Sequence, residues 1–99
     1  AVTLAKAGAK IIAVGRYTDR LQKTVDEIHE LGGEAAPVRV DLNFKHIIDD
    51  LYGHAAAPFG APTILVNAAG VNLRQKWTDV TLESWDVTLH LNLSVPFFL

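Results

Sequence analysis

Three short segments carry the side chains best suited to chemistry, and each directly follows an apolar run. They are Gly15-Arg16, Asp41-Leu42 and Asn67-Ala68-Ala69-Gly70. Gly15 lets the backbone turn sharply or approach a ligand, while the Arg16 guanidinium is a permanent cation that suits a phosphate. The Asp41 carboxylate can accept hydrogen bonds from an exocyclic amine, and the small residues after Asn67 leave space for a flat ring or a ribose. Together these residue types predict a nucleotide-binding cleft.

Each of these signals also has a simpler explanation when it is taken alone. Arg16 would equally suit an ion pair with Asp19 on the surface. Asp41 would suit a helix cap, and Gly70 a left-handed turn. In open parallel α/β sheets, however, ligands bind beyond the carboxyl ends of the strands. The position of all three segments at the ends of successive predicted strands therefore favours one shared site.

The order of helices and strands decides whether these segments can meet. Apolar periodicity predicts strands at residues 10–14, 35–40 and 63–66. It predicts helices over residues 1–7, after a cap at Thr18 or Asp19, after a cap at Asn43, and after a cap at Thr81. Strict alternation of helices with buried-type strands requires crossover connections and a parallel sheet. The predicted fold class is therefore α/β, a doubly wound parallel sheet that is incomplete in this chain.

The composition excludes several classes of function. The 99 residues carry a net charge of −2, so no basic field for nucleic acid or an anionic membrane is expected. The chain has no cysteine, which excludes a disulfide framework and a cysteine nucleophile within it. Its apolar runs are far shorter than the roughly 20 residues that cross a bilayer, and a cytoplasmic location is expected. The histidines lie on different predicted elements without paired ligand spacing, so no metal site is predicted.

A known family combines these features. The segment Asn67-Ala68-Ala69-Gly70 after an apolar strand resembles the Asn-Asn/Ala-Ala-Gly motif of the short-chain dehydrogenase/reductase family, which lines the adenine-ribose side of the cofactor. Asp41 after Val38-Arg39-Val40 resembles the family's aspartate that contacts the adenine. Trp85-Asp86 followed by Leu91-Asn92-Leu93 is similar to the family's fourth-helix pattern. The resemblance extends over essentially the whole chain.

The resemblance implies a domain and an activity. Residues 1–99 would be part of a single NAD(P)-binding Rossmann domain, without its first strand, its glycine-rich turn and its C-terminal catalytic half. The parent protein would be an oxidoreductase that transfers a hydride between NADP(H) and a small carbonyl or alcohol substrate. Tyr17 and Tyr52 have no lysine four residues later, so the family's Tyr-x-x-x-Lys pair is not within these residues. This chain alone is expected to transfer no hydride, and its isolated folding is doubtful.

Asn92 is the one catalytic residue that the resemblance implies within the chain. It would belong to the family's Asn-Ser-Tyr-Lys tetrad and hold a structural water in the proton relay, through its backbone, at a local helix irregularity. Pro96 fits such an irregularity because it has no N–H to bond the Asn92 carbonyl. The alternative for Asn92 is a buried polar residue that is satisfied inside its own helix.

The residues at the end of the second strand of the fold indicate the cofactor. Family members with an acidic residue there favour NAD, because the carboxylate binds the ribose 2′-hydroxyl and repels a 2′-phosphate. Here Gly15 occupies that position and Arg16 follows. Charge complementarity therefore predicts NADP(H), with NAD as the second choice. The resemblance also implies a homotetramer or homodimer that associates through the helix at residues 81–99.

Two other classes of protein remain open. A non-catalytic nucleotide-binding or scaffolding Rossmann domain would keep the fold and lose the chemistry. An intact serine and Tyr-x-x-x-Lys after Leu99 would favour the enzyme. A flavodoxin-like or receiver domain shares the alternation of elements but gives no reason for Asn67-Ala68-Ala69-Gly70. The identity of the substrate and the direction of the reaction do not follow from these residues.

Overall fold

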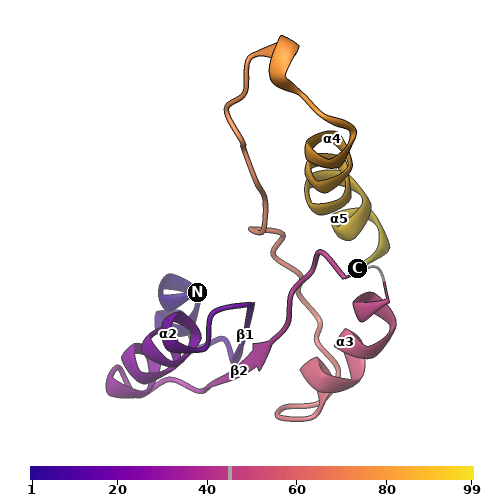
Figure 1. The fold of residues 1–99 in the computed structure, drawn as a ribbon. Helices are drawn as coiled ribbons and strands as arrows, with labels where there is room; N and C mark the ends of the chain where they lie inside the picture. The colour runs from indigo at the N-terminus through magenta and orange to yellow at the C-terminus, as the bar shows by residue number, and fades with distance from the viewer. Residues whose placement is uncertain (45) are drawn as a thin grey trace.

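The fold consists of a pair of strands with helices beside it, and of a C-terminal helical segment that lies away from the strands (Figure 1). The computed structural model describes residues 1–44 and 46–99. In chain order the elements are α1 (Val2–Lys6), β1 (Ile11–Gly15), α2 (Thr18–Glu30), β2 (Ala35–Arg39), α3 (Ile47–Ala56), the 3₁₀ turn η1 (Trp77–Asp79), α4 (Leu82–Leu89), the π-helical turn η2 (His90–Ser94) and α5 (Val95–Phe98). The predicted alternation of helix and strand is confirmed from residue 2 to residue 56.

The two strands are parallel, and α2 connects them. Ile11 lies opposite Ala35, and Gly15 lies opposite Arg39. The first face of this pair packs against α1 and α2, where Ile28 is fully buried. Leu21, Val25 and Ile28 follow the i, i+4, i+7 spacing of one helix face, which indicates a buried stripe, and all three side chains are buried.

The opposite face of the pair packs against α3. Side chains alternate along a strand, so Ala35 joins the α2 side while Val38 and Val40 point the other way. Val38 and Val40 form a second cluster with Leu51 of α3. Helices therefore cover both faces, as a doubly wound sheet requires, and the predicted fold class is confirmed for this incomplete sheet.

The strand predicted at residues 63–66 does not form. Residues 57–76 contain no helix or strand and run as a long trace in Figure 1. Ile64 is 79% exposed and Val66 is 63% exposed. In the common strand order 3-2-1-4, β1 and β2 take places 2 and 3, and the strand predicted at residues 63–66 takes place 4. Its partner would be the strand in place 1, which is neither β1 nor β2. No described residue supplies that strand, and unpaired N–H and C=O groups cannot make a ladder.

Two helix starts also differ from the prediction. Thr18 is the first residue of α2 rather than its cap, and Tyr17 takes the cap position without a side-chain hydrogen bond. The predicted cap at Asn43 is wrong, because the Asn43 N–H donates to Asp41 Oδ1 at 3.0 Å and α3 begins only at Ile47. Residue 45, which the predicted helix includes, lies outside the described residues.

The predicted cap at Thr81 is confirmed. The Ser84 N–H donates to Thr81 Oγ1 at 3.1 Å, and the Thr81 N–H donates to Ser84 Oγ at 3.0 Å. This reciprocal pair satisfies two backbone donors at the start of α4. Glu83 lies in the first turn, where the positive end of the helix dipole favours a carboxylate.

A large apolar surface remains uncovered. The accessible surface is 7510 Å², whereas a compact protein of this mass exposes about 5,500 Å². The radius of gyration is 15.3 Å, against about 13 Å for a compact domain of this length. Trp77, Leu82 and Phe97 are each more than three-quarters exposed. Exposed apolar surface on this scale is typical of an interaction surface.

Gly33 provides a test of the packing between α2 and β2. A Cβ at Gly33 would lie 2.8 Å from Ile28 Cγ2 and 3.3 Å from the Ile28 carbonyl oxygen. Gly33→Ala should therefore lower the free energy of unfolding of the full-length protein by about 1–3 kcal/mol, because the fully buried Ile28 must move. Gly53→Ala is the matched control, since a Cβ there meets nothing within 4 Å. Denaturant unfolding that finds the two variants equally stable would contradict this packing.

Candidate functional site

The ends of β1 and β2 lie side by side. Gly15 is the register partner of Arg39, and the Val40 N–H donates to the Gly15 carbonyl oxygen at 2.8 Å. Because the strands are parallel, the segments that follow β1 and β2 leave the sheet at the same end. The structure therefore brings the predicted segment Gly15-Arg16 next to the predicted segment Asp41-Leu42.

Three arginines gather at this edge. The Arg16 guanidinium lies 4.9 Å from the centre of the Tyr17 ring, and the Arg20 guanidinium lies 5.0 Å from the same ring. Arg39 Nε donates to the Arg16 carbonyl oxygen at 3.4 Å. The Arg16 and Arg20 charges lie against one aromatic face, which holds them without neutralising them. The site is therefore more strongly cationic than Arg16 alone would make it.

The simpler explanation for Arg16 fails in this structure. Within the described residues, the ion pair that forms joins Lys10 and Glu34 at 3.4 Å, and Arg16 makes none with Asp19. Sequence reasoning missed the roles of Arg20 and Arg39. Arg20 follows Arg16 by four residues, which is a local signal, whereas no periodicity in the sequence indicates the contact of Arg39 with Arg16 across 23 positions.

Asp41 lies in a tight turn rather than at a helix cap. Its Oδ1 atom accepts the Asn43 N–H at 3.0 Å, and its carbonyl oxygen accepts the Phe44 N–H at 3.2 Å. The side chain is half-buried. Leu42 follows at the centre of the turn and packs against the cluster of Val38 and Leu51. One carboxylate oxygen thus shapes the turn, and the second has no donor among the described residues.

Asn92 holds the chain that follows Gly70. Its Nδ2 group donates to the Val71 carbonyl oxygen at 2.8 Å, and its Oδ1 atom accepts the Val71 N–H at 2.8 Å. The alternative of a side chain satisfied inside its own helix is therefore wrong. Gly70 permits the close approach, since a Cβ there would lie 3.1 Å from Asn92 Oδ1.

The helix irregularity predicted around Asn92 is confirmed. Residues His90–Ser94 form a π-helical turn between α4 and α5. Pro96 lies four residues after Asn92 and cannot donate to its carbonyl oxygen in the regular helical pattern. Such turns are rare in helices and occur frequently at functional sites.

His90 connects the π-helical turn to the segment that follows β2, a contact that the sequence did not indicate. Its Nε2 atom lies 3.1 Å from the Leu42 carbonyl oxygen, a contact between residues 48 positions apart. The π-helical turn thus contacts the Asp41-Leu42 segment through His90 and the Gly70-Val71 segment through Asn92. It lies between the ends of the second and third predicted strands.

The third predicted segment is only partly placed. Gly70 meets Asn92, while Asn67, Ala68 and Ala69 are exposed. The cause is the same as for the absent strand, because the main chain before Gly70 has no neighbouring strand to fix it. The structure therefore brings together Gly15, Arg16, Asp41 and Leu42, and links Gly70 to them through the π-helical turn.

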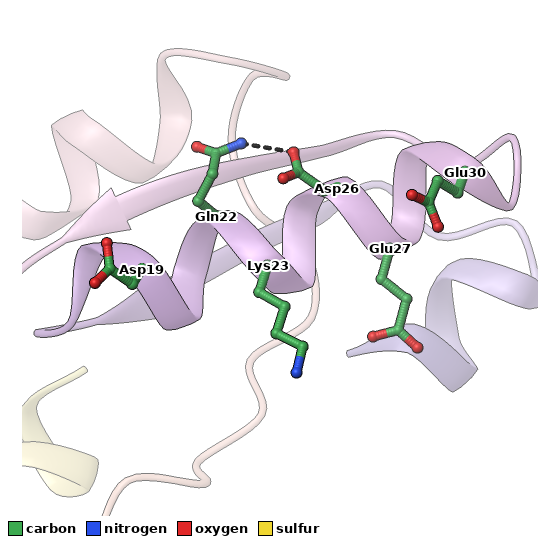
Figure 2. Close-up of a pocket in the computed structure, with 6 residues that line it drawn as sticks. All are labelled: Asp19, Gln22, Lys23, Asp26, Glu27 and Glu30. Carbon is green, nitrogen blue, oxygen red and sulfur yellow. Dashed lines mark hydrogen bonds between the residues drawn. The ribbon is translucent and has the colours of Figure 1, made fainter.

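A shallow hollow elsewhere does not belong to this site. Figure 2 shows it on the outer face of α2, with Gln22 Nε2 donating to Asp26 Oδ1 at 2.8 Å. Its lining residues are Asp19, Gln22, Lys23, Asp26, Glu27 and Glu30. Four carboxylates on one helix face would repel a phosphate, and the hollow is the solvated side of an amphipathic helix. Among the described residues, no helix has both the length and the apolar character needed to span a bilayer.

Comparison with known proteins identifies the family. The family model described as short chain dehydrogenase matches residues 1–99. An uncharacterized oxidoreductase of Staphylococcus aureus is 31% identical over 93 residues, which cover 94% of this chain and 39% of that protein. The chain thus spans about two fifths of the length of this relative.

Two solved structures share the fold. One is a metagenomic short-chain oxidoreductase in complex with NADP, with a TM-score of 0.90 and 28% identity, covering 99% of this chain and 45% of that one. The other is L-sorbose reductase from Gluconobacter frateurii complexed with NADPH and L-sorbose, with a TM-score of 0.88 and 26% identity, covering 98% of this chain and 37% of that one. Residues 1–99 therefore belong to the short-chain dehydrogenase/reductase family and form a fragment of its Rossmann fold.

Proposed function

We propose that the full-length protein containing residues 1–99 transfers a hydride between NADP(H) and a small carbonyl or alcohol substrate. Family membership supports an oxidoreductase, and the similar structures named above contain NADP or NADPH. The observation that carries the proposal is the arginine cluster beside the Asp41 turn, at the shared end of two parallel strands.

The residues present fit NADP(H). Arg16 would bind the 2′-phosphate, because its guanidinium has no carboxylate partner among the described residues and can donate two parallel hydrogen bonds. Arg20 and Arg39 add positive charge beside it. Gly15 leaves room where an acidic side chain would repel the phosphate. The free oxygen of Asp41 would accept from the adenine amine.

The small segment Asn67-Ala68-Ala69-Gly70, together with Leu42, would line the adenosine half of the cofactor. When bound, NADP(H) donates or accepts the hydride at its nicotinamide ring. The general acid/base would be a tyrosine outside these residues, with a nearby lysine lowering its pKa. This fragment alone would therefore be inactive.

Asn92 would serve the proton relay through its backbone. Each polar group of its side chain makes one hydrogen bond to Val71, which holds the residue in place, and we assign the water to the Asn92 carbonyl oxygen. The π-helical turn and Pro96 interrupt the regular helical hydrogen bonding at this point. In this role the side chain fixes the position of the carbonyl and the carbonyl holds the water.

The proposal also includes the oligomeric state of the full-length protein and its cellular location. The helix at residues 81–99 exposes Leu82, Trp85 and Phe97, which would be covered in a homotetramer or homodimer. The cytoplasmic location expected from the sequence stays a prediction.

Cofactor binding and turnover by the full-length protein test this proposal. We expect NADPH to bind at least about 10-fold more tightly than NADH in a fluorescence titration, because only NADPH carries the phosphate that meets Arg16. Oxidation of NADPH should follow when a panel of small ketones and aldehydes is added. Binding without turnover on any member of the panel would favour the non-catalytic alternative, and no binding of either cofactor would contradict the proposal.

A further inference from the structure

We infer that His90 is a positioning residue for the adenine side of the cofactor site, an inference that rests on the proposed function. Its ring holds the carbonyl group of Leu42 and thereby fixes the turn that presents Asp41. His90 itself would not touch the cofactor. The inference follows from how the turn is attached to the rest of the molecule.

The hydrogen bond between His90 and Leu42 has a defined donor and acceptor. His90 Nε2 lies 3.1 Å from the Leu42 carbonyl oxygen, and a carbonyl oxygen only accepts. The proton of this hydrogen bond must therefore sit on Nε2. The ring is half-buried, so water competes weakly for the Leu42 carbonyl.

The hydrogen bonds within the turn fix its shape but not its place. The Asn43 N–H donates to Asp41 Oδ1 at 3.0 Å, and the Phe44 N–H donates to the Asp41 carbonyl oxygen at 3.2 Å. Both bonds join residues of the same short segment. The apolar side chain of Leu42 anchors the turn to α3, and the His90 bond anchors its main chain to the π-helical turn. Without His90, the Leu42 carbonyl group would lose its hydrogen bond to the π-helical turn, and the orientation of Asp41 would be held less firmly.

The π-helical turn is suited to act as a brace between two strand ends. His90 reaches the Asp41-Leu42 segment, and Asn92 reaches the main chain at Val71 with two hydrogen bonds of 2.8 Å. These two side chains are only two residues apart, so the segments they hold keep a fixed separation. The proposed adenosine site lies along the same two segments, which makes its width depend on His90.

The surroundings of the ring permit substitutions that test this inference. Beside His90 lies a hollow lined by Ile48, Asp49, Ser94 and Phe98. His90→Phe keeps a ring of similar size and removes the donor. His90→Gln keeps an N–H donor at a comparable reach. His54→Phe is the matched control, because His54 is exposed on α3 and lies outside both segments.

The experiment measures NADPH binding to each variant of the full-length protein by fluorescence titration, together with kcat, KM and the melting temperature. His90→Phe should raise the Kd and the KM for NADPH by about 10-fold, the effect of losing one hydrogen bond that holds the site, with kcat at saturating NADPH within about twofold. His90→Gln should recover most of that affinity. His54→Phe should leave the Kd unchanged.

Two results would overturn the inference while leaving the proposed function in place. In the first, folded His90→Phe binds NADPH as the parent protein does. In the second, His90→Phe and His90→Gln weaken binding equally and lower the melting temperature equally, which would reduce His90 to a packing role. Failure of the parent protein itself to bind NADPH would instead overturn the proposed function, and this inference with it.

Discussion

Arg16→Asp should reverse the cofactor preference of the full-length protein, lowering the NADPH/NADH ratio of kcat/KM by about 100-fold or more. The parent side chain would make charge-assisted hydrogen bonds to the 2′-phosphate, each contributing about 1.5–3 kcal/mol. The aspartate would repel the same phosphate and accept hydrogen bonds from the ribose hydroxyls of NADH. Steady-state kinetics with both cofactors measures the ratio.

Lys23→Asp is the matched control for this reversal. It makes the same change of net charge, but Lys23 lies on the outer face of α2 (Figure 2), away from the strand ends. Its ratio should stay within about twofold of the parent value, because exposed charges at a distance are screened by salt. An unchanged ratio in Arg16→Asp, or an equal change in both variants, would show that Arg16 does not bind the phosphate.

Asn92→Leu should lower kcat by about 100-fold in protein that remains folded. The substitution removes both hydrogen bonds to Val71 and leaves the Val71 N–H and carbonyl groups without partners. The main chain at Asn92 then shifts, and with it the carbonyl oxygen proposed to hold the water of the proton relay. Proton relays of this type contribute about 10²–10⁴-fold to rate, which sets the scale of the loss.

Asn72→Leu is the corresponding control. Asn72 is an exposed neighbour whose Oδ1 atom accepts the Arg74 N–H at 3.0 Å within its own loop. Turnover should therefore change little in that variant. Full turnover in Asn92→Leu, in protein that circular dichroism shows to be folded, would exclude the relay role.

Local patterns predicted those elements whose stability is local. The stripe of Leu21, Val25 and Ile28 repeats at helical spacing, and burial of one face follows directly from it. The cap at Thr81 was predictable because its partner Ser84 lies three residues away. In both cases the interacting groups are close in sequence.

The failures lie where distant groups decide the outcome. The apolar run at residues 63–66 has the composition of a strand, but a strand forms only beside a partner. The helix expected after Asn43 begins later, because the Asp41 side chain takes the Asn43 N–H into a turn. This competition between side chain and helix is typical of aspartate and asparagine.

The candidate site also has a part that the sequence predicted and a part that it did not. The closeness of Arg16 and Asp41 was predictable from parallel topology, which places the carboxyl ends of adjacent strands at the same end of the sheet. The contacts of Arg39 with Arg16 and of His90 with Leu42 span 23 and 48 positions, and no periodicity in the sequence indicates them. They depend on how the helices pack over the strands.

A crystal structure of the full-length protein with bound NADP would show whether Arg16 and Asp41 bind the adenosine half of the cofactor. In that structure the 2′-phosphate should lie within about 3 Å of the Arg16 guanidinium, the adenine beside Asp41, and Asn67-Ala68-Ala69-Gly70 along the same adenosine. A cofactor bound away from Arg16, or strand ends that open onto separate surfaces, would contradict the proposed site.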